Sequence, residues 1–179
     1  FTSKSYSLER LSEFLSRFVA KLGLEVHILF GHSLGGHICL QSLNDIKPSQ
    51  LITWGTPPLT NPPVLEKVFT SDPSSAYLFK NMVSDKELQS LYEICFDARS
   101  AQGFLDFSSQ FNKTDVNFRE DFIKEFSTFS FKDEFIELEK FEGEVLFVHG
   151  ANEKLINKEY LCENCFEYRV YPIIDAGHF

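Results

Sequence analysis

The chain has 179 residues, enough for one domain with a sizeable core, and its hydrophobic and charged fractions of 43% and 24% are those of ordinary globular proteins. Its formal net charge of −9 disfavours nucleic acids and anionic membrane surfaces as partners, because both would repel it. No apolar run approaches the ~18 residues of a membrane span, and the first residues lack the basic start and apolar centre of a signal peptide, so we expect a cytoplasmic protein.

The first third of the chain has the pattern of a strand–helix–strand unit. Apolar residues at helical spacing predict a helix over 8–22, with Ser7 as its N-cap. A short apolar strand is predicted over 25–31, a helix over 34–44 and a second apolar strand over 51–55. A helix between two buried strands is typical of a parallel sheet.

The pattern then changes. After the proline-rich stretch 56–63 no strand pattern occurs before about residue 141, and short helices are predicted instead. Their predicted ranges are 64–70, 75–82, 84–97 and 115–127. The strand pattern returns at 144–150 and 166–175, with a short helix near 157–163 between them.

These elements predict an α/β fold, with a mostly parallel sheet flanked by helices and interrupted by a helical insertion. The expected division is a core formed by 1–60 and 143–179, and an insertion over 61–142. Insertions of this length commonly act as lids over active sites, so we expect a helical lid.

The segment Gly31-His32-Ser33-Leu34-Gly35 matches G-x-S-x-G between a predicted strand and a predicted helix. A turn sharp enough to lift Ser33 above the sheet brings backbone segments close together, so we expect glycine to be needed at both Gly31 and Gly35. The first N–H groups of the helix would point toward the serine, where negative charge develops in acyl transfer. The alternative is a loop serine that caps the helix.

A nucleophilic serine needs a base, and five histidines are available: His27, His32, His37, His149 and His178. His178 lies in a loop just after the last predicted strand, where its side chain can reach across the end of the sheet. We therefore predict His178 as the base, and the alternative is an exposed histidine without a role. An acid is needed at another strand end, and Glu153 follows the strand 144–150. The alternative for Glu153 is a surface charge.

Together these motifs resemble the α/β-hydrolase fold family, in which the catalytic residues follow in the order serine, acid, histidine. "FGHSLGGH" is similar to the family's nucleophile elbow, "VLFVHGANEKLIN" to the turn that carries its acid, and "IIDAGHF" to the turn that carries its histidine. The resemblance implies that Ser33 forms an acyl-enzyme, that water activated by His178 releases it, and that the N–H of Leu34 supplies half of the oxyanion hole.

The sequence departs from the family in three respects. The acid is usually aspartate, whereas Glu153 stands here. The family has further strands before this starting point, including the loop with the second oxyanion-hole donor, and a closing helix after the histidine. The resemblance therefore implies a fragment of a longer hydrolase, and we expect poor activity from the isolated chain, since one missing oxyanion donor costs about 10²–10³ in turnover.

The predicted insertion is rich in phenylalanine, which either packs its helices against the core or lines an acyl pocket above Ser33. These residues are Phe104, Phe107, Phe111, Phe118, Phe122, Phe126, Phe129, Phe131 and Phe135. A pocket of this kind favours an ester or thioester of a small to medium apolar substrate. The same triad could serve carbon–carbon bond, amide or peptide hydrolysis or perhydrolysis, and a non-catalytic binding protein is a further alternative. The oligomeric state stays open.

The cysteines do not indicate a metal or redox site. Cys39 and Cys95 lie among apolar residues and are expected to be buried thiols. The single C-x-x-C at 162–165 has no second pair and no nearby histidine couple. No phosphate-binding loop, metal-ligand cluster or nucleotide fingerprint occurs, so no cofactor is expected.

Overall fold

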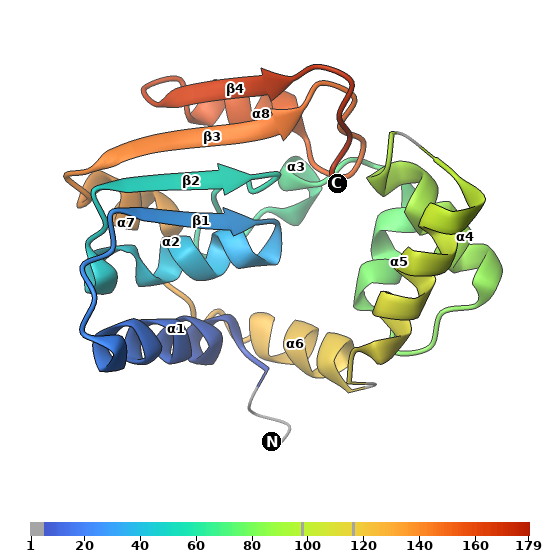
Figure 1. Cartoon of the computed structure of the whole chain (residues 1–179), viewed down its shortest axis with the longest axis horizontal. Coiled ribbons are helices and arrows are strands. Elements are labelled where there is room, and N and C mark those ends of the chain that lie inside the picture. Colours follow the sequence, from blue (N-terminus) through green and yellow to red (C-terminus); the bar gives the residue numbers. More distant parts are fainter. Residues whose placement is uncertain (1–5, 98, 116) are drawn as a thin grey trace.

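The structure is a computed structural model, and it describes residues 6–97, 99–115 and 117–179. This described part of the chain forms four strands and nine helical segments (Figure 1). In chain order they are α1 (Leu8–Leu22), β1 (Ile28–His32), α2 (Leu34–Ile46), β2 (Gln50–Trp54), α3 (Leu65–Val68), the 3₁₀ helix η2 (Pro73–Phe79), α4 (Asp85–Cys95), α5 (Ala101–Lys113), α6 (Phe118–Phe126), α7 (Glu134–Glu139), β3 (Glu144–Gly150), α8 (Lys158–Asn164) and β4 (Arg169–Ile173).

The four strands form one sheet in the order β1-β2-β3-β4, and every neighbouring pair is parallel. The carboxyl ends of all four strands therefore meet at one edge of the sheet, where parallel α/β folds place their ligands. The predicted α/β class, with a parallel sheet and helices packed against it, is confirmed.

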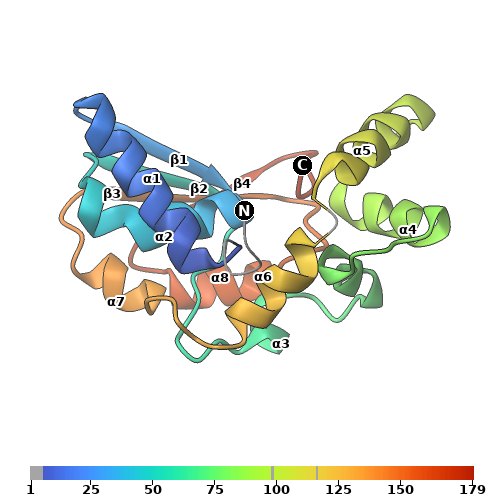
Figure 2. The same ribbon diagram turned by 90° about the horizontal axis from the view of Figure 1, so that it is seen from below.

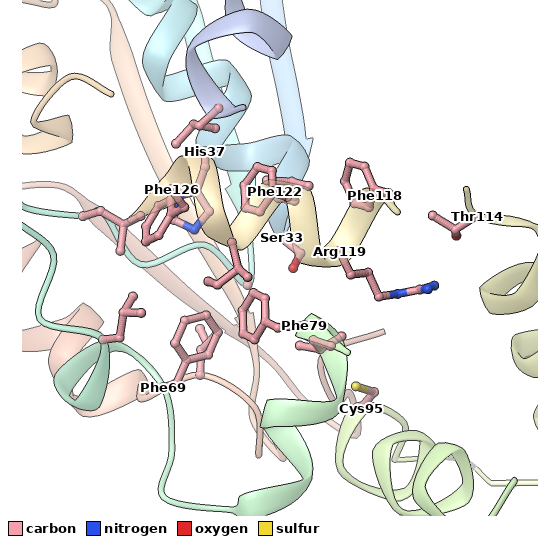
Figure 3. A pocket seen from close by; sticks show the side chains of 18 of the residues that line it. Ser33, His37, Phe69, Phe79, Cys95, Thr114, Phe118, Arg119, Phe122 and Phe126 are labelled. Carbon is pink, nitrogen blue, oxygen red and sulfur yellow. The ribbon is translucent and has the colours of Figure 1, made fainter. Parts of the chain in front are cut away.

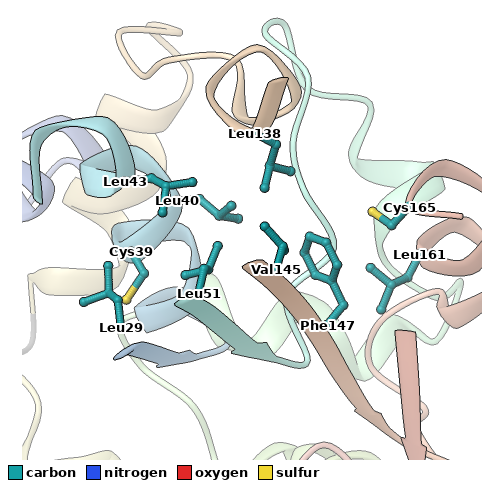
Figure 4. Packing of buried hydrophobic residues seen from close by; sticks show 10 residues of the cluster. All are labelled: Leu29, Cys39, Leu40, Leu43, Leu51, Leu138, Val145, Phe147, Leu161 and Cys165. Carbon is teal, nitrogen blue, oxygen red and sulfur yellow. The ribbon is translucent and has the colours of Figure 1, made fainter. Parts of the chain in front are cut away.

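One face of the sheet is covered by helices and the other is open. Alternate strand residues, such as Leu51 and Phe147, pack against α2, α7 and α8 in the main core (Figure 4). On the other face the edge strands carry exposed aromatic residues, Phe30 at 59% and Tyr171 at 63%. Helix α1 packs on α2, on the same side of the sheet (Figures 1 and 2).

Local signals in the sequence placed the core elements well. The Ser7 hydroxyl accepts a hydrogen bond from the N–H of Arg10 at 3.2 Å, and Gly23 ends α1 with φ 65°. Strand β3 has its predicted bounds, whereas β1 begins only at Ile28. His27 therefore precedes the strand instead of lying within it, which corrects that expectation.

In the described residues between β2 and β3 every regular element is helical. Helices α4 and α5 lie beyond the carboxyl ends of the strands, whereas α7 lies against the covered face of the sheet (Figure 1). Helix α4 begins with a capping box formed by Ser84 and Glu87. The sequence analysis missed α5 and α7. The spacing of Phe104, Phe107 and Phe111 was the signal for α5. No helix in the described part of the chain is both long and apolar enough to cross a membrane.

Candidate active site

Ser33 occupies the turn from β1 into α2 with φ 51° and ψ −121°, a conformation that is costly for a residue with a side chain. Two contacts with the end of the neighbouring strand fix this backbone. The N–H of Ser33 donates to Trp54 O at 2.8 Å, and the Thr56 hydroxyl donates to Ser33 O at 3.0 Å. The Ser33 side chain makes no capping hydrogen bond to α2, so the interpretation as a helix cap is wrong.

The close approach in this turn requires glycine at position 31. A Cβ atom there would lie 2.5 Å from Gly35 O, a distance that real structures do not tolerate. The expectation was wrong for Gly35, because a Cβ atom at that position would meet nothing within 4 Å. Gly36 is the second crowded position, since a Cβ atom there would overlap the side chain of Thr56.

His178 and Glu153 form a fully buried pair. His178 Nδ1 lies 2.9 Å from Glu153 Oε2, and both side chains are 0% exposed. The other carboxylate oxygen accepts from the N–H groups of Leu155 at 2.7 Å and Ile156 at 3.3 Å. Glu153 follows β3 and His178 follows β4, so the two residues meet at the carboxyl edge of the sheet. Glu153 is therefore not a surface charge, and His178 is not an exposed histidine.

The environment keeps the Glu153 carboxyl ionised. Burial alone would raise its pKa. The hydrogen bond with His178, the attraction to that imidazole in its protonated form and the two backbone N–H donors together outweigh burial, so the pKa of Glu153 lies below its usual value. An ionised carboxylate at Nδ1 holds the imidazole in the tautomer whose Nε2 can accept a proton.

The Nε2 atom of His178 is buried and has no hydrogen-bond partner among the described residues. The Ser33 hydroxyl and His178 are not hydrogen-bonded to one another in this part of the chain, as is common for catalytic pairs without substrate. The imidazole packs against Gly55, where a Cβ atom would lie 2.7 Å from His178 Cε1. Gly55 also has φ 59°, so both space and backbone favour glycine beside the ring.

The turn that carries His178 is held from two directions. The carbonyl oxygen of His178 lies 2.8 Å from His32 Nε2. The N–H groups of His178 and Phe179 both donate to Cys95 O at the end of α4, at 2.9 and 3.0 Å. Burial and the nearby charge of His178 lower the pKa of His32, which favours its neutral form. The sequence analysis missed this contact, although His32 directly precedes Ser33.

Ser33 opens into a pocket of about 300 Å³ between the sheet edge and the helical insertion (Figure 3). Five phenylalanines of the insertion that the sequence singled out line this pocket: Phe107, Phe111, Phe118, Phe122 and Phe126. Phe104, Phe129, Phe131 and Phe135 are not among the lining residues. Phe104 and Phe135 instead pack against core clusters and Phe131 is buried in one, so both interpretations of the phenylalanines hold in part.

A second histidine–glutamate pair borders the same pocket and was missed from sequence. His37 Nδ1 lies 2.9 Å from Glu134 Oε2, with side-chain exposures of 13% and 0%. Glu134 also accepts from Leu59 N at 2.8 Å and from Gln41 Nε2 at 3.1 Å. The pair therefore connects α2 to the segments where the chain leaves and re-enters the core.

The buried thiols are confirmed. Burial raises the pKa of Cys39 to about 11 and that of Cys95 to about 12, so both are protonated at neutral pH and poor nucleophiles. Cys162 is exposed, Cys165 is buried and both are free thiols. In the described ranges no group of three or more His, Cys, Asp or Glu side chains is arranged to hold a metal ion.

A scan against protein-family models and a search of curated proteins give no match. Solved structures do match. The N-acyl homoserine lactonase AidH complexed with N-butanoyl homoserine is 23% identical with a TM-score of 0.81, over 98% of this chain and 65% of that chain. The chain has the α/β-hydrolase fold. An esterase from Exiguobacterium antarcticum is 19% identical (TM-score 0.74, 99% of this chain and 69% of that one).

A bromoperoxidase from Bacillus anthracis also shares this α/β-hydrolase fold, at 18% identity and a TM-score of 0.72, over 97% of this chain and 68% of that one. The chain spans about 65% of the length of the lactonase. These likenesses extend over 97–99% of this chain.

Proposed function

We propose that this chain carries the active site of a serine hydrolase that cleaves a carboxylic ester or thioester of a small to medium apolar substrate through an acyl-enzyme. Ser33 is the nucleophile, His178 the base and Glu153 the acid that orients it. The N–H of Leu34, at the start of α2, is one donor of the oxyanion hole. The helices over 61–142 act as a lid above the serine.

The first step transfers the Ser33 proton to His178 Nε2 while Ser33 Oγ attacks the carbonyl carbon. The carbonyl oxygen becomes an oxyanion beside the N-terminus of α2, where the first N–H groups have no partner within the helix. Glu153 stabilises the imidazolium that forms, and His178 then protonates the leaving alcohol or thiol. In the second step His178 deprotonates water, which hydrolyses the acyl group from Ser33.

The observation that carries this proposal is the buried, unpartnered Nε2 of His178, combined with the strained backbone of Ser33 at the same edge of the sheet. Leaving a buried polar atom without a hydrogen bond costs about 1–3 kcal/mol, and such groups are concentrated at functional sites. A non-catalytic binding protein would not need either feature.

The lining of the pocket supports the substrate class. Apart from four polar side chains, the pocket is bordered by aliphatic and aromatic residues together with Gly55, Pro57 and Cys95. The polar side chains are those of Ser33, His37, Thr114 and Arg119. An apolar acyl or alcohol group would gain about 25 cal/mol per Å² buried here, whereas a sugar would leave its hydroxyls unpaired.

Labelling with a fluorophosphonate tests the proposal, since this reagent reacts with activated serines. We expect the wild-type protein to be labelled, Ser33→Ala not to be labelled, and His178→Gln to react much more slowly. Ser130→Ala, which changes an exposed serine of the insertion, is the matched control and should label like the wild type. Undiminished labelling of a folded Ser33→Ala variant would exclude this serine as the nucleophile.

Hydrolysis of a cyclic ester is a second candidate. It is favoured by the TM-scores of 0.81 and 0.82 with AidH, which include complexes with its lactone and with the ring-opened product. Variants of that lactonase in which a serine or a glutamate is replaced by glycine have also been solved. Proton release from N-acyl lactones, measured beside open-chain esters of equal length, distinguishes the two candidates.

A further inference from the structure

One polar group in the pocket has no part in the proposed reaction, namely the guanidinium of Arg119. Arg119 lies in the first turn of α6 and is 8% exposed, and in the described part of the chain no other lysine or arginine is buried. Its side chain extends away from Ser33, on the side of the pocket where Thr114 lies (Figure 3).

The protein itself gives Arg119 little compensation for its charge. Arg119 Nη2 donates to Phe111 O at 2.7 Å, and Arg119 Cζ lies 3.6 Å from the centroid of the Phe111 ring. These contacts engage one of the five guanidinium N–H donors, and neither of them brings a negative charge to the guanidinium. Among the described residues no carboxylate forms an ion pair with Arg119, although exposed pairs such as Arg17 with Glu13 occur.

Two carboxylates close to Arg119 in sequence are engaged elsewhere. Asp115 accepts from the Tyr6 hydroxyl at 2.7 Å and from the N–H of Asn117 at 2.9 Å. Glu120 lies 3.3 Å from Lys124 Nζ in an exposed ion pair. The side of the guanidinium that borders the pocket is therefore left for a group from outside the chain.

The chemistry of that group follows from the guanidinium. Burial lowers the pKa of Arg119, but arginine stays protonated in proteins, so the pocket contains a full positive charge. A buried cation is stable only when it is paired and hydrogen-bonded. The planar fork of N–H donors matches a carboxylate, which it can bind through two parallel hydrogen bonds.

We propose that Arg119 binds a carboxylate that the substrate carries at a distance from its ester bond. The substrate class is then an apolar ester with one anionic end, and Arg119 is a residue that determines specificity. This inference rests on the proposed function, because it takes Ser33 as the reacting group. The carboxylate can belong to the acyl or to the alcohol part of the substrate.

Matched substrates test the inference. Nitrophenyl monoesters of dicarboxylic acids place a carboxylate at the end of the acyl chain, and alkanoate esters of hydroxy acids place it in the alcohol part. Each is compared with its methyl-terminated analogue of equal length. We expect one of the two series to be preferred over its neutral analogues through a lower KM, and Arg119→Met to reduce that preference about thirtyfold or more, as for loss of one partner of a buried charged pair.

The controls separate binding from structure. Arg17→Met removes an exposed arginine and should keep the preference, and Arg119→Lys should retain part of it because the charge remains. An Arg119→Met variant that slows neutral and anionic esters equally would assign Arg119 a structural role and overturn the inference. Equal rates for both members of every pair in the wild type would overturn it too.

A binding measurement does not depend on turnover. On Ser33→Ala, calorimetry compares octanoate with octanamide, and we expect tighter binding of octanoate that Arg119→Met removes. If no ester is hydrolysed but this difference is found, the proposed function fails and the carboxylate site stands. If esters are hydrolysed and octanoate has no advantage, the carboxylate site alone fails. The wild-type and Ser33→Ala results decide the matter even if Arg119→Met does not fold.

Discussion

Two histidine–glutamate pairs lie near Ser33, and their comparison separates the arrangement that we propose as catalytic from one that we infer to be structural. In each pair the histidine Nδ1 lies 2.9 Å from a carboxylate oxygen of a glutamate whose side chain is 0% exposed. Distance and burial therefore do not distinguish His178–Glu153 from His37–Glu134. The two pairs are distinguished by the other hydrogen-bond partners of each glutamate and by the position of each imidazole.

Glu153 is held by backbone N–H groups of its own turn, Leu155 and Ile156, and so has one side-chain partner, His178. Among the described residues its long-range side-chain hydrogen bond is the one to that imidazole. Glu134 instead accepts hydrogen bonds from α2 and from Leu59, which join separate parts of the fold. We infer that the first pair serves chemistry and the second fastens the insertion to the core.

The largest expected difference between the pairs is in activity. We expect His178→Gln to lower kcat about 10⁴-fold or more, because the serine then has no base. His37→Gln should change kcat less than about tenfold, since glutamine keeps a hydrogen-bond donor toward Glu134. Ester hydrolysis by the two purified variants measures this. A loss as large for His37→Gln as for His178→Gln would identify His37 as a second candidate base.

The next difference is in stability. Replacing Glu134 by alanine leaves His37, Gln41 and the Leu59 N–H without their shared acceptor, and we expect it to lower the free energy of unfolding by about 3–5 kcal/mol, as for other broken buried pairs. Glu163→Ala, at an exposed position of α8, is the control and should change it by less than about 0.5 kcal/mol.

Urea unfolding followed by circular dichroism gives both values. A Glu134→Ala variant as stable as the control would show that the hydrogen bonds to Glu134 do not fasten the insertion. The same variant should retain the labelling of Ser33 by a fluorophosphonate under conditions where it is folded, because in the described part of the chain Glu134 forms no hydrogen bond or ion pair with His178.

The strands and the turns that carry Ser33, Glu153 and His178 were predicted from the sequence better than the helices between β2 and β3. The strand pattern and G-x-S-x-G depend on local rules, and they placed β3 and the turn of Ser33 correctly. The position of Glu153 after a strand was enough to bring it to His178. Helix α7, which carries Glu134, has only six residues, and its partner His37 lies 97 positions away, so no local pattern could reveal that pair.

The environment of Arg119 could not be predicted from the sequence either. Its burial results from the packing of α6 beside Phe111 of α5, a helix that the sequence analysis missed. Gly36 shows the same limit at short range. The glycine pattern pointed to Gly35, whereas the crowded atom belongs to Thr56 on the neighbouring strand end. Tertiary contacts determine which glycines are needed and which charges are buried, and these contacts cannot be predicted from the local pattern of a single sequence.

The smallest expected effect is the pH dependence of the His178–Glu153 pair. The folded-state pKa of Glu153 lies below its ordinary value of 4.5. Its charge therefore stabilises the fold fully above the pKa of the unfolded chain, and this stability is lost as the pH falls through the lower, folded value. We expect the unfolding free energy of the wild type to exceed that of Glu153→Gln by about 1–3 kcal/mol at pH 7, and this difference to shrink below about pH 4.5.

The urea midpoints of both proteins between pH 7 and pH 3 measure this difference, and Glu163→Gln is the control for the loss of one charge. An advantage that stays constant down to pH 3 would mean that the ionised carboxylate is not what stabilises the pair.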